Sequence, residues 1–493
     1  MSLLTMCCLR LRVGVLLMCA AVAHAAPAWA ARMVGMGDGN DSVAFTHITR
    51  LGLPVLDIQL AGGEWPTAEY VVAPEGHWGK SIVNPTRVPG RMQMYVGGSV
   101  VYDTGEYVDA DSVTGMTLRI RGNSTAWKEK KPYKIKLQHK ADLLRRDSID
   151  GRDKNWALIR DEHLFAMQGF EVNRILGMPW TPGYQYVNVV INNRYEGIYM
   201  LVESVRRNTD CRLNVSKEGY IFESDAYWWK EPIYLTSGIY NRLRYTFKYP
   251  DEDDFTAADT LYMTSLVRQM ERSYMRDNYP EVIDVRSYAA WCLGHDILGT
   301  KDYPGTNRFY LKYDKSDTTR VVMPLLWDFD SSESVADNWS QPHLWFYSYL
   351  FNNANRTFVD EFVNLWNRVS PTLYETIFTH FDTMRRSREG SAISLSLQLN
   401  NQRWGTSYLI YTCFIDRPAW IKSRVEWLNA EVAKLNATMG DVDLNGHVDV
   451  DDVNAVINMI LEYAEPNLAT GDMNGDGKLD VVDLQAIIDL VLK

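Results

Sequence analysis

The last 54 residues carry a tandem repeat, which restricts their fold more than any other feature of the sequence does. The segments DVDLNGHVDVDDVNAVINMIL and DMNGDGKLDVVDLQAIIDLVL align with each other at a spacing of 31 residues. Each begins with oxygen-bearing side chains at alternate positions, and a glycine, Gly446 or Gly477, stands at position six. This spacing is typical of a calcium loop, in which oxygen ligands surround the ion and glycine makes the sharp turn. The repeat therefore predicts two Ca²⁺ sites.

Both loops have a complete set of expected ligands at positions one, three, five, seven, nine and twelve. The seventh position contributes its backbone carbonyl, and the other positions contribute side-chain oxygens. The first loop consists of Asp441, Asp443, Asn445, His447, Asp449 and Asp452, and the second of Asp472, Asn474, Asp476, Lys478, Asp480 and Asp483.

One short amphipathic helix is expected after each loop. Its apolar positions are Val453, Val456, Ile457, Ile460 and Leu461 in the first copy, and Leu484, Ile487, Ile488, Val491 and Leu492 in the second. No comparable helix is expected before the first loop, and Asp replaces the usual Glu at position twelve.

With these two departures from an ordinary EF-hand, residues 440–493 resemble a type I dockerin. The resemblance implies a small all-α domain with two Ca²⁺ ions, which docks a secreted protein onto a cohesin of a cellulosome-like scaffold. The resemblance also implies that Val450-Asp451 and Val481-Val482 recognise the cohesin. These residues are mostly apolar, whereas Ser or Thr is usual at these positions. The alternative is a generic acidic tail.

The acidity of the chain is concentrated in this tail. From Gly440 onward there are twelve Asp and Glu against two Lys, which accounts for nearly all of the net charge of -11. The remaining body is almost neutral and holds no long basic run, so a nucleic-acid partner is not expected. With 493 residues and 46% hydrophobic residues, two or three globular domains are expected.

Residues 1–30 are typical of a signal peptide. Two arginines precede an apolar run from Val13 to Ala23, and small residues permit cleavage after Ala25 or Ala30. No later stretch reaches the roughly 18 apolar residues of a membrane span, so we expect a secreted protein without one. After removal of the signal only Cys211, Cys292 and Cys413 remain, which excludes a disulfide framework.

The body changes from strand patterns to helix patterns along the chain. Residues 42–113 predict a β-rich entry region, and residues 187–205 predict a hairpin that turns at Asn192-Asn193 and closes on Glu203. Helical spacing prevails over residues 261–296 and 346–436. Strands followed by helices favour an α+β fold.

A second hairpin is expected within LRIRGNSTAWKEKKPYKIKL, residues 118–137. Strand alternation places Leu118 and Ile120 on one face and Arg119 and Arg121 on the other, and the lysines that follow alternate in the same way. The Gly-Asn-Ser-Thr turn offers backbone N–H groups with little side-chain bulk, which suits an anion such as phosphate. The alternative is a solvated hairpin with a basic outer face.

Residues 299–332 contain the parts that phosphoryl transfer requires. Asp302 and Asn307 are five residues apart, and a strand then leads to Asp328-Phe329-Asp330. A carboxylate, an amide and a strand ending in Asp-Phe-Asp follow the order of the base and metal ligands in protein kinases. For the aspartates, the alternative role is turn stabilisation.

The motifs RGNSTAWKEKKPYKIKL, DKNWALIRDE, INNRYEGIYMLVE and PLLWDFDSS occur in the order found in the CotH (spore-coat protein H) kinase family, which the chain resembles over roughly residues 50–430. The resemblance implies an atypical protein-kinase-like domain over residues 114–436, with a β-rich N-terminal part and a helical C-terminal half. It also implies binding of ATP with Mg²⁺ or Mn²⁺ and phosphorylation of a secreted protein substrate. One departure is HLFAMQGF, which stands where the family usually has Leu-Arg-Asn.

Site residues follow from the same resemblance. The turn of Arg121, Gly122, Asn123 and Ser124, together with Lys131, Lys134 or Lys136, would contact the phosphates. Lys136 is the first choice for the catalytic lysine because it is deepest in its strand. Glu203 would orient a lysine, Asp302 would be the general base, and Asn307 and Asp328 would hold the metal.

Two other functions fit parts of the sequence. One is a non-catalytic kinase-like binding or structural module within a polysaccharide-degrading complex. The other is polysaccharide hydrolysis, suggested by the dockerin pattern, the 16 tryptophans and paired carboxylates such as Asp328 and Asp330.

Overall fold

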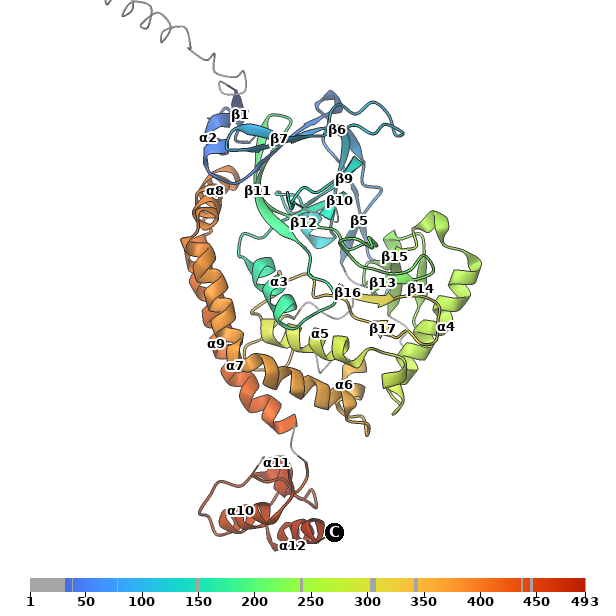
Figure 1. Cartoon of the computed structure of the whole chain (residues 1–493), viewed down its shortest axis with the longest axis vertical. Helices are drawn as coiled ribbons and strands as arrows, with labels where there is room; N and C mark the ends of the chain where they lie inside the picture. The colour runs from blue at the N-terminus through green and yellow to red at the C-terminus, as the bar shows by residue number, and fades with distance from the viewer. Residues whose placement is uncertain are drawn as a thin grey trace, which may run out of the picture.

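The computed structural model describes residues 32–37, 39–77, 79–147, 151–239, 243–301, 307–340, 345–435, 438–443 and 447–492. The expected signal peptide, Asp302 and Asn445 lie outside these residues. The described part of the body is a mixed α+β structure, with most of its strands in the first half and most of its helices in the second half (Figure 1). None of the helices in this part of the chain is long and apolar enough to cross a membrane.

Seven strands form a closed barrel. They are hydrogen-bonded in the order β10-β9-β8-β6-β3-β11-β12, and β10 also pairs with β12, which closes the ring. The strands are β3 (Val55–Leu60), β6 (Val88–Val96), β8 (Met116–Ile120), β9 (Tyr133–Ala141), β10 (Asp153–Ile159), β11 (Tyr184–Ile191) and β12 (Arg194–Glu203).

Both hairpins expected from the sequence are part of this barrel. β8 pairs with β9, and their alternate apolar residues, such as Leu118 and Ile135, are fully buried in the barrel interior. β11 pairs with β12 through a turn in which Asn192 and Asn193 have φ of 48° and 60°. Such left-handed backbone matches the twist of the strands, and Asn tolerates it better than most residues.

Short elements extend the barrel at its edges. β1 (Met33–Gly35) joins β12 and carries β2 (Ser42–Ala44), and β7 (Ser99–Asp103) joins β6. Helix α2 (Phe45–Arg50) follows β2. A separate two-stranded hairpin consists of β4 (Glu69–Val72) and β5 (Lys80–Val83).

A second sheet has the order β14-β15-β13-β16-β17. Its strands come from two distant parts of the chain: β13 (Tyr220–Ser224), β14 (Tyr234–Thr236) and β15 (Arg244–Tyr249) precede helices α4 (Ala257–Ser273) and α5 (Val285–Leu298), whereas β16 (Arg308–Lys312) and β17 (Val321–Val322) follow them.

The remaining helices are α3 (Phe165–Ile175), which follows β10, and α6 (Trp345–Phe351), α7 (Thr357–Arg386), α8 (Arg388–Trp404) and α9 (Ile410–Leu435). Helices α3, α5, α7 and α9 contribute to the largest core, which also contains the outer face of β12 (Figure 1). The predicted helical second half is thus confirmed.

The tail contains α10 (Val450–Ile460), α11 (Leu468–Gly471) and α12 (Val481–Val491). Val456 and Ile487, from equivalent positions of the two repeats, are fully buried in its small core. In contrast, Leu461 and Leu492 are exposed. The predicted helix after each loop is present, although only part of each expected apolar stripe is buried.

Candidate functional site

The outer face of β8 and β9 is basic, as the alternation predicted. Arg119 lies opposite Lys134, and Thr117 lies opposite Lys136. Residues directly opposite each other in a sheet point to the same side, so these cations lie on the barrel wall away from its apolar interior. The expected basic face is therefore present, half-buried at Arg119 and Lys134 and exposed at Lys136.

The cations on this wall repel one another. Burial lowers the pKa of Lys134 to about 7, and repulsion from four neighbouring cations adds to the effect. Burial also lowers the pKa of Arg119 to about 10, although Glu231 opposes this shift. The cations around Lys134 are Arg119, Arg206, Arg87 and Lys248, from β8, the segment after β12, the segment before β6, and β15.

Lys136 lies farther along β9 and is exposed, whereas Lys134 is half-buried, so the expectation that Lys136 is the deepest lysine of this strand is wrong. Partial desolvation lowers its pKa, and Arg87, Lys154 and Arg206 lower it further. Asp251 is the neighbour that opposes this shift. Lys136 is thus part of the same positive region, at a position two residues beyond Lys134.

The Arg-Gly-Asn-Ser turn is held in a fixed shape. Gly122 has φ of 89°, and a Cβ there would lie 2.4 Å from Oγ1 of Thr125, so any other residue would strain the backbone and displace its neighbour. Oδ1 of Asn123 accepts hydrogen bonds from Oγ of Ser81 at 3.0 Å and from Nζ of Lys230 at 2.5 Å. Ser124 is exposed and begins a short 3-10 helix, η3 (Ser124–Trp127).

The charge of Arg121, in this turn, is influenced by the Asp-Phe-Asp segment. It is partly buried, and burial lowers the pKa of its guanidinium. Attraction to the carboxylates of Asp328 and Glu223 opposes this shift. Two motifs separated by about two hundred residues in the sequence therefore interact electrostatically in the fold.

Asp328 forms a hydrogen bond with Asn307. Nδ2 of Asn307 donates a hydrogen bond to Oδ2 of Asp328 at 2.5 Å. The next residue, Phe329, is buried against α3, where its ring packs edge-on to Phe170 with 5.3 Å between centroids. Gly169 makes room for this ring, because a Cβ there would lie 2.2 Å from it. The packing of Phe329 fixes the position of the neighbouring carboxylate.

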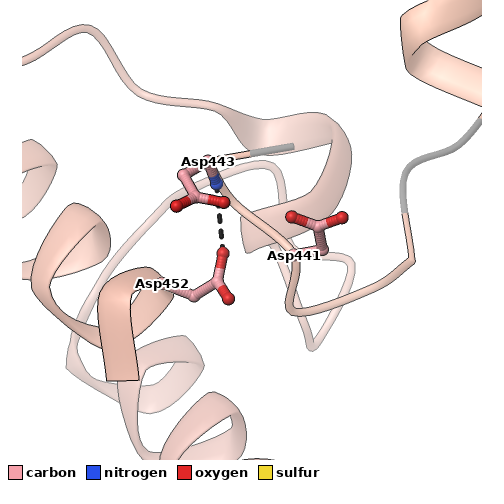
Figure 2. A group of neighbouring side chains, drawn as sticks. All are labelled: Asp441, Asp443 and Asp452. Carbon is pink, nitrogen blue, oxygen red and sulfur yellow. Dashed lines mark hydrogen bonds between the residues drawn. The ribbon is translucent and has the colours of Figure 1, made fainter. Parts of the chain in front are cut away.

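The first calcium loop brings three of its expected ligands together. Carboxylate oxygens of Asp441, Asp443 and Asp452 lie within 4.8 Å of one another (Figure 2). Oδ1 of Asp452 accepts hydrogen bonds from the backbone N–H groups of Val442 at 2.5 Å and Asp443 at 3.1 Å. Hard oxygen ligands at such separations suit Ca²⁺, which binds six to eight oxygens at about 2.3–2.6 Å.

The second loop repeats these bonds. Oδ1 of Asp483 accepts from the N–H groups of Met473 at 2.8 Å and Asn474 at 3.2 Å. In both loops the other oxygen of the twelfth residue accepts from the ninth, which is Asp449 or Asp480. The ninth residue is in each case the N-cap of the helix that follows. The sequence repeat is therefore a structural repeat as well.

Backbone N–H groups also surround the other expected ligands of the second loop. The carboxylate of Asp472 accepts from Gly475 and Gly477, each at 2.8 Å. Asp476 donates its N–H to Asn474 Oδ1 at 2.9 Å and accepts from the N–H of Lys478 at 2.9 Å. These bonds curl the backbone around the ligand positions. His447 of the first loop is exposed.

Comparison with protein families identifies both parts of the chain. Residues 118–406 match the model described as CotH kinase protein. The chain belongs to the CotH kinase family. Residues 439–492 match the dockerin type I domain, which implies Ca²⁺ binding and a cohesin partner in an extracellular, cellulosome-type assembly. A comparison with curated proteins finds no match.

Within this CotH kinase domain, Glu203 was expected to orient a lysine and Lys131 to contact the phosphates, but both side chains bind other groups. Glu203 contacts Nη2 of Arg146 at 2.8 Å and the N–H of Gly183 at 2.9 Å. It lies opposite Trp156 on the interior face of the barrel wall, whereas Lys136 is on the outer face. In this structure, Glu203 therefore pairs with an arginine and not with a lysine of β9.

The side chain of Lys131 points back to the turn that precedes β9. Its Nζ donates to the carbonyl oxygen of Ala126 at 2.9 Å and lies 3.4 Å from Oη of Tyr70. These contacts stabilise η3 against the β4–β5 hairpin, so Lys131 supports the shape of the turn.

Several charged residues beside the turn were not singled out in the sequence. Glu223 forms an ion pair with Lys248 at 2.8 Å, and Lys230 holds Asn123. Burial and the neighbouring Asp225 raise the pKa of Glu223, while Lys248 opposes the shift. These residues belong to β13, η5 (Trp228–Lys230) and β15, and no local motif marks them, because only the fold brings the second sheet beside β8.

Proposed function

We propose that the protein is a secreted atypical kinase that transfers phosphate from ATP to side chains of another secreted protein. Its dockerin would dock it, through Ca²⁺-dependent cohesin binding, to a cellulosome-like scaffold that degrades polysaccharides. Family membership supports the kinase class. The single observation that carries the proposal is the hydrogen bond between Asn307 and Asp328, the two expected metal ligands, with Asp328 near enough to Arg121 to favour its charged form.

The cationic wall, formed by Arg119, Lys134 and Lys136 on the outer face of β8 and β9, would bind the phosphates. Lys134 and Arg119 lie side by side, and their mutual repulsion would be relieved by a polyanion. Arg121 would stand between the phosphates and the metal ligands. The backbone N–H groups near Gly122 would add hydrogen bonds without side-chain bulk. Lys136 would contribute to the same field from farther along β9.

Asn307 and Asp328 would hold Mg²⁺ or Mn²⁺, because amide and carboxylate oxygens are the ligands that these ions prefer. The ion, when bound, would neutralise charge on the phosphates. Asp302 would accept the proton of the substrate hydroxyl as the hydroxyl oxygen bonds to the γ-phosphorus and the bond to the bridging oxygen breaks, which releases ADP.

The proposal is tested with the protein lacking residues 1–30, labelled ATP and Mg²⁺ or Mn²⁺, with phosphate transfer measured to the protein itself and to co-secreted proteins. Transfer that Asp302→Ala reduces by about 10² to 10⁴, with nucleotide affinity kept, supports the assigned roles. Metal-dependent binding without transfer would favour a non-catalytic kinase-like module. Absence of both binding and transfer would contradict the proposal.

A further inference from the structure

A cavity of about 240 Å³ lies outside the cationic wall. It is formed by the segment before β9, the loop after β10 and the end of α8, and residues assigned above to the phosphates or the metal do not line it. The lining residues that matter here are Lys130, Arg160, Glu162, Asn400, Trp404 and Tyr408.

Lys130 is buried in this cavity with all its donors used. Its Nζ contacts Glu162 Oε1 at 2.8 Å, the carbonyl oxygen of Ile198 at 2.5 Å and Asn400 Oδ1 at 2.8 Å. An ammonium group has three N–H donors, so these partners satisfy it. Lys130 thus neutralises Glu162 and fixes Asn400.

The contact with Lys130 decides the orientation of the Asn400 amide. Lysine can only donate, so the amide atom that faces it must be the oxygen. The same oxygen accepts from the N–H of Ile198 at 3.3 Å. Nδ2 of Asn400 is left buried without a hydrogen-bond partner, in a residue that is 1% exposed. An unsatisfied buried donor costs about 1–3 kcal/mol, so an acceptor in the cavity would be favourable.

Arg160 provides a second unsatisfied donor. Its Nε is buried without a hydrogen-bond partner and lies 3.5 Å from Glu162 Oε1, beyond a good hydrogen bond. Arg160 and Lys130 both pair with Glu162, and the lining as a whole has three cations, Lys128, Lys130 and Arg160, against Glu129 and Glu162. This excess of one positive charge, with two N–H groups that lack a hydrogen bond, favours an anion.

Aromatic residues form another part of the lining. Nε1 of Trp404 donates to the carbonyl oxygen of Glu196 at 3.0 Å, which fixes the indole. The ring of Tyr408 packs edge-on against His163 with 4.9 Å between centroids. These rings would contact the apolar or planar part of a ligand.

We propose that this cavity binds a small anion, a carboxylate or phosphate group, through the side chains of Arg160 and Asn400. The volume is below the ~300–1,000 Å³ of drug-sized sites, so the ligand is a small metabolite or the end of a single side chain. This inference is independent of kinase activity, because it uses none of the residues assigned to phosphoryl transfer.

The test is isothermal titration of the full chain without residues 1–30, using inorganic phosphate and citrate at constant ionic strength. Arg160→Gln removes the charge and Nε, and we expect it to weaken binding by about tenfold or more, the effect of losing a charged hydrogen bond. Arg286→Gln on α5 is the matched control, because Arg286 also pairs with a glutamate, Glu361 at 3.3 Å, but lies outside both positive regions. Preference for phosphate or citrate identifies the anion class.

Binding that Arg160→Gln weakens and Arg286→Gln preserves supports the site. The reverse pattern, or no binding of either anion at millimolar concentration, overturns it. If Arg160→Gln does not fold, as judged by its melting transition, Arg160→Lys keeps the charge without Nε. Unchanged affinity in Arg160→Lys would then also overturn the assigned contact.

Discussion

Asn307 donates a hydrogen bond to Asp328 at 2.5 Å across 21 residues of sequence, and both residues have left-handed backbone, with φ of 64° and 66°. This conformation is unfavourable for most residues and is tolerated best by Gly, Asn and Asp. At both positions the residue type satisfies the backbone and also carries a side-chain oxygen of the kind that Mg²⁺ prefers. A substitution here must therefore be chosen so that the backbone requirement is kept.

Asp328→Asn is the substitution that meets this condition. Asn tolerates the left-handed backbone, so we expect the melting temperature to remain close to that of the natural protein. Loss of the carboxylate should abolish Mg²⁺-dependent nucleotide binding, measured by titration with and without the metal. Asp330→Asn, in the same segment, is the matched control and should bind. Retention of metal-dependent binding in Asp328→Asn would exclude Asp328 as the metal ligand.

The low pKa of Lys134 predicts that nucleotide binding is accompanied by proton uptake. With a pKa of about 7, its amine is mostly neutral at pH 8. Phosphates beside it would favour the charged form, so binding at pH 8 should take up close to one proton. The uptake is measured by calorimetric titration in two buffers of different ionisation enthalpy.

Two variants separate the possible sources of this proton. Lys134→Arg remains charged at pH 8, so it should bind nucleotide without proton uptake, whereas Lys134→Met should bind weakly. The same proton uptake in Lys134→Arg would mean that another group titrates.

The pKa of Lys134 also has a consequence for stability. Because it is about 7 in the folded chain against an ordinary value of 10.5, the unfolded chain binds more protons between these values. The free energy of unfolding therefore rises with pH across this window, and the penalty is complete below pH 7. Lys134→Met should flatten this dependence in denaturant unfolding at pH 7 and pH 10. An unchanged slope would contradict the assigned pKa.

The features that the sequence predicted well are those with local rules. Alternation placed Leu118 and Arg119 on opposite faces of their strand, and Leu118 is buried in the barrel interior. Asn192-Asn193 marked a turn, and both residues have positive φ. The calcium loops were predicted because their spacing is itself the coordination pattern. Helical periodicity located the second half of the chain in the same way.

Features that depend on distant contacts were not predicted. Barrel closure joins β10 to β12, and the sequence carries no signal for which edges meet. Glu203 was expected beside a lysine, yet Arg146, 57 residues away, binds it. Lys130 and Asn400 are separated by 270 residues, and neither was singled out. In each case the charge was visible in the sequence, but its partner is set by the tertiary fold.

Gly122 provides a test of the turn. Gly122→Ala would combine the strain of φ of 89° with a Cβ 2.4 Å from Thr125 Oγ1, so the turn must shift. Gly97→Ala is the matched control, because φ there is 57° but nothing lies within 4 Å of the added Cβ. Both should lose about 1–2 kcal/mol of stability from the backbone strain. Only Gly122→Ala should also lose nucleotide affinity, measured by titration, and equal affinity in both variants would exclude the turn from the phosphate site.

The cohesin-binding surface is expected at the start of α10 and α12. Val450, Val481 and Val482 are 61%, 67% and 56% exposed, although they are apolar. Val482→Asp should weaken binding to a cognate cohesin by about tenfold or more, because a charge would be buried in the interface. Calcium affinity should be unchanged, because the side chain of Val482 is not a loop ligand. Equal cohesin affinity for this variant and the natural protein would place the interface elsewhere.

Calcium should control the folding of the tail alone. In the first loop the carboxylates of Asp441, Asp443 and Asp452 lie within 4.8 Å of one another, so without an ion they repel. Folding of residues 440–493 should therefore be coupled to Ca²⁺ binding, and a chelator should remove one calorimetric transition while the nearly neutral body keeps its own.

The decisive comparison uses the full chain and a chain that ends near Thr438, each melted with and without chelator. Asp441→Ala combined with Asp472→Ala should behave like the chelated protein and lose cohesin binding, because each loop lacks its first ligand, while nucleotide binding is kept. A calcium-dependent rise in the body transition that is equal in the shortened chain would show that the ion acts elsewhere. A tail that melts at the same temperature in both conditions would contradict the assignment of these aspartates as calcium ligands.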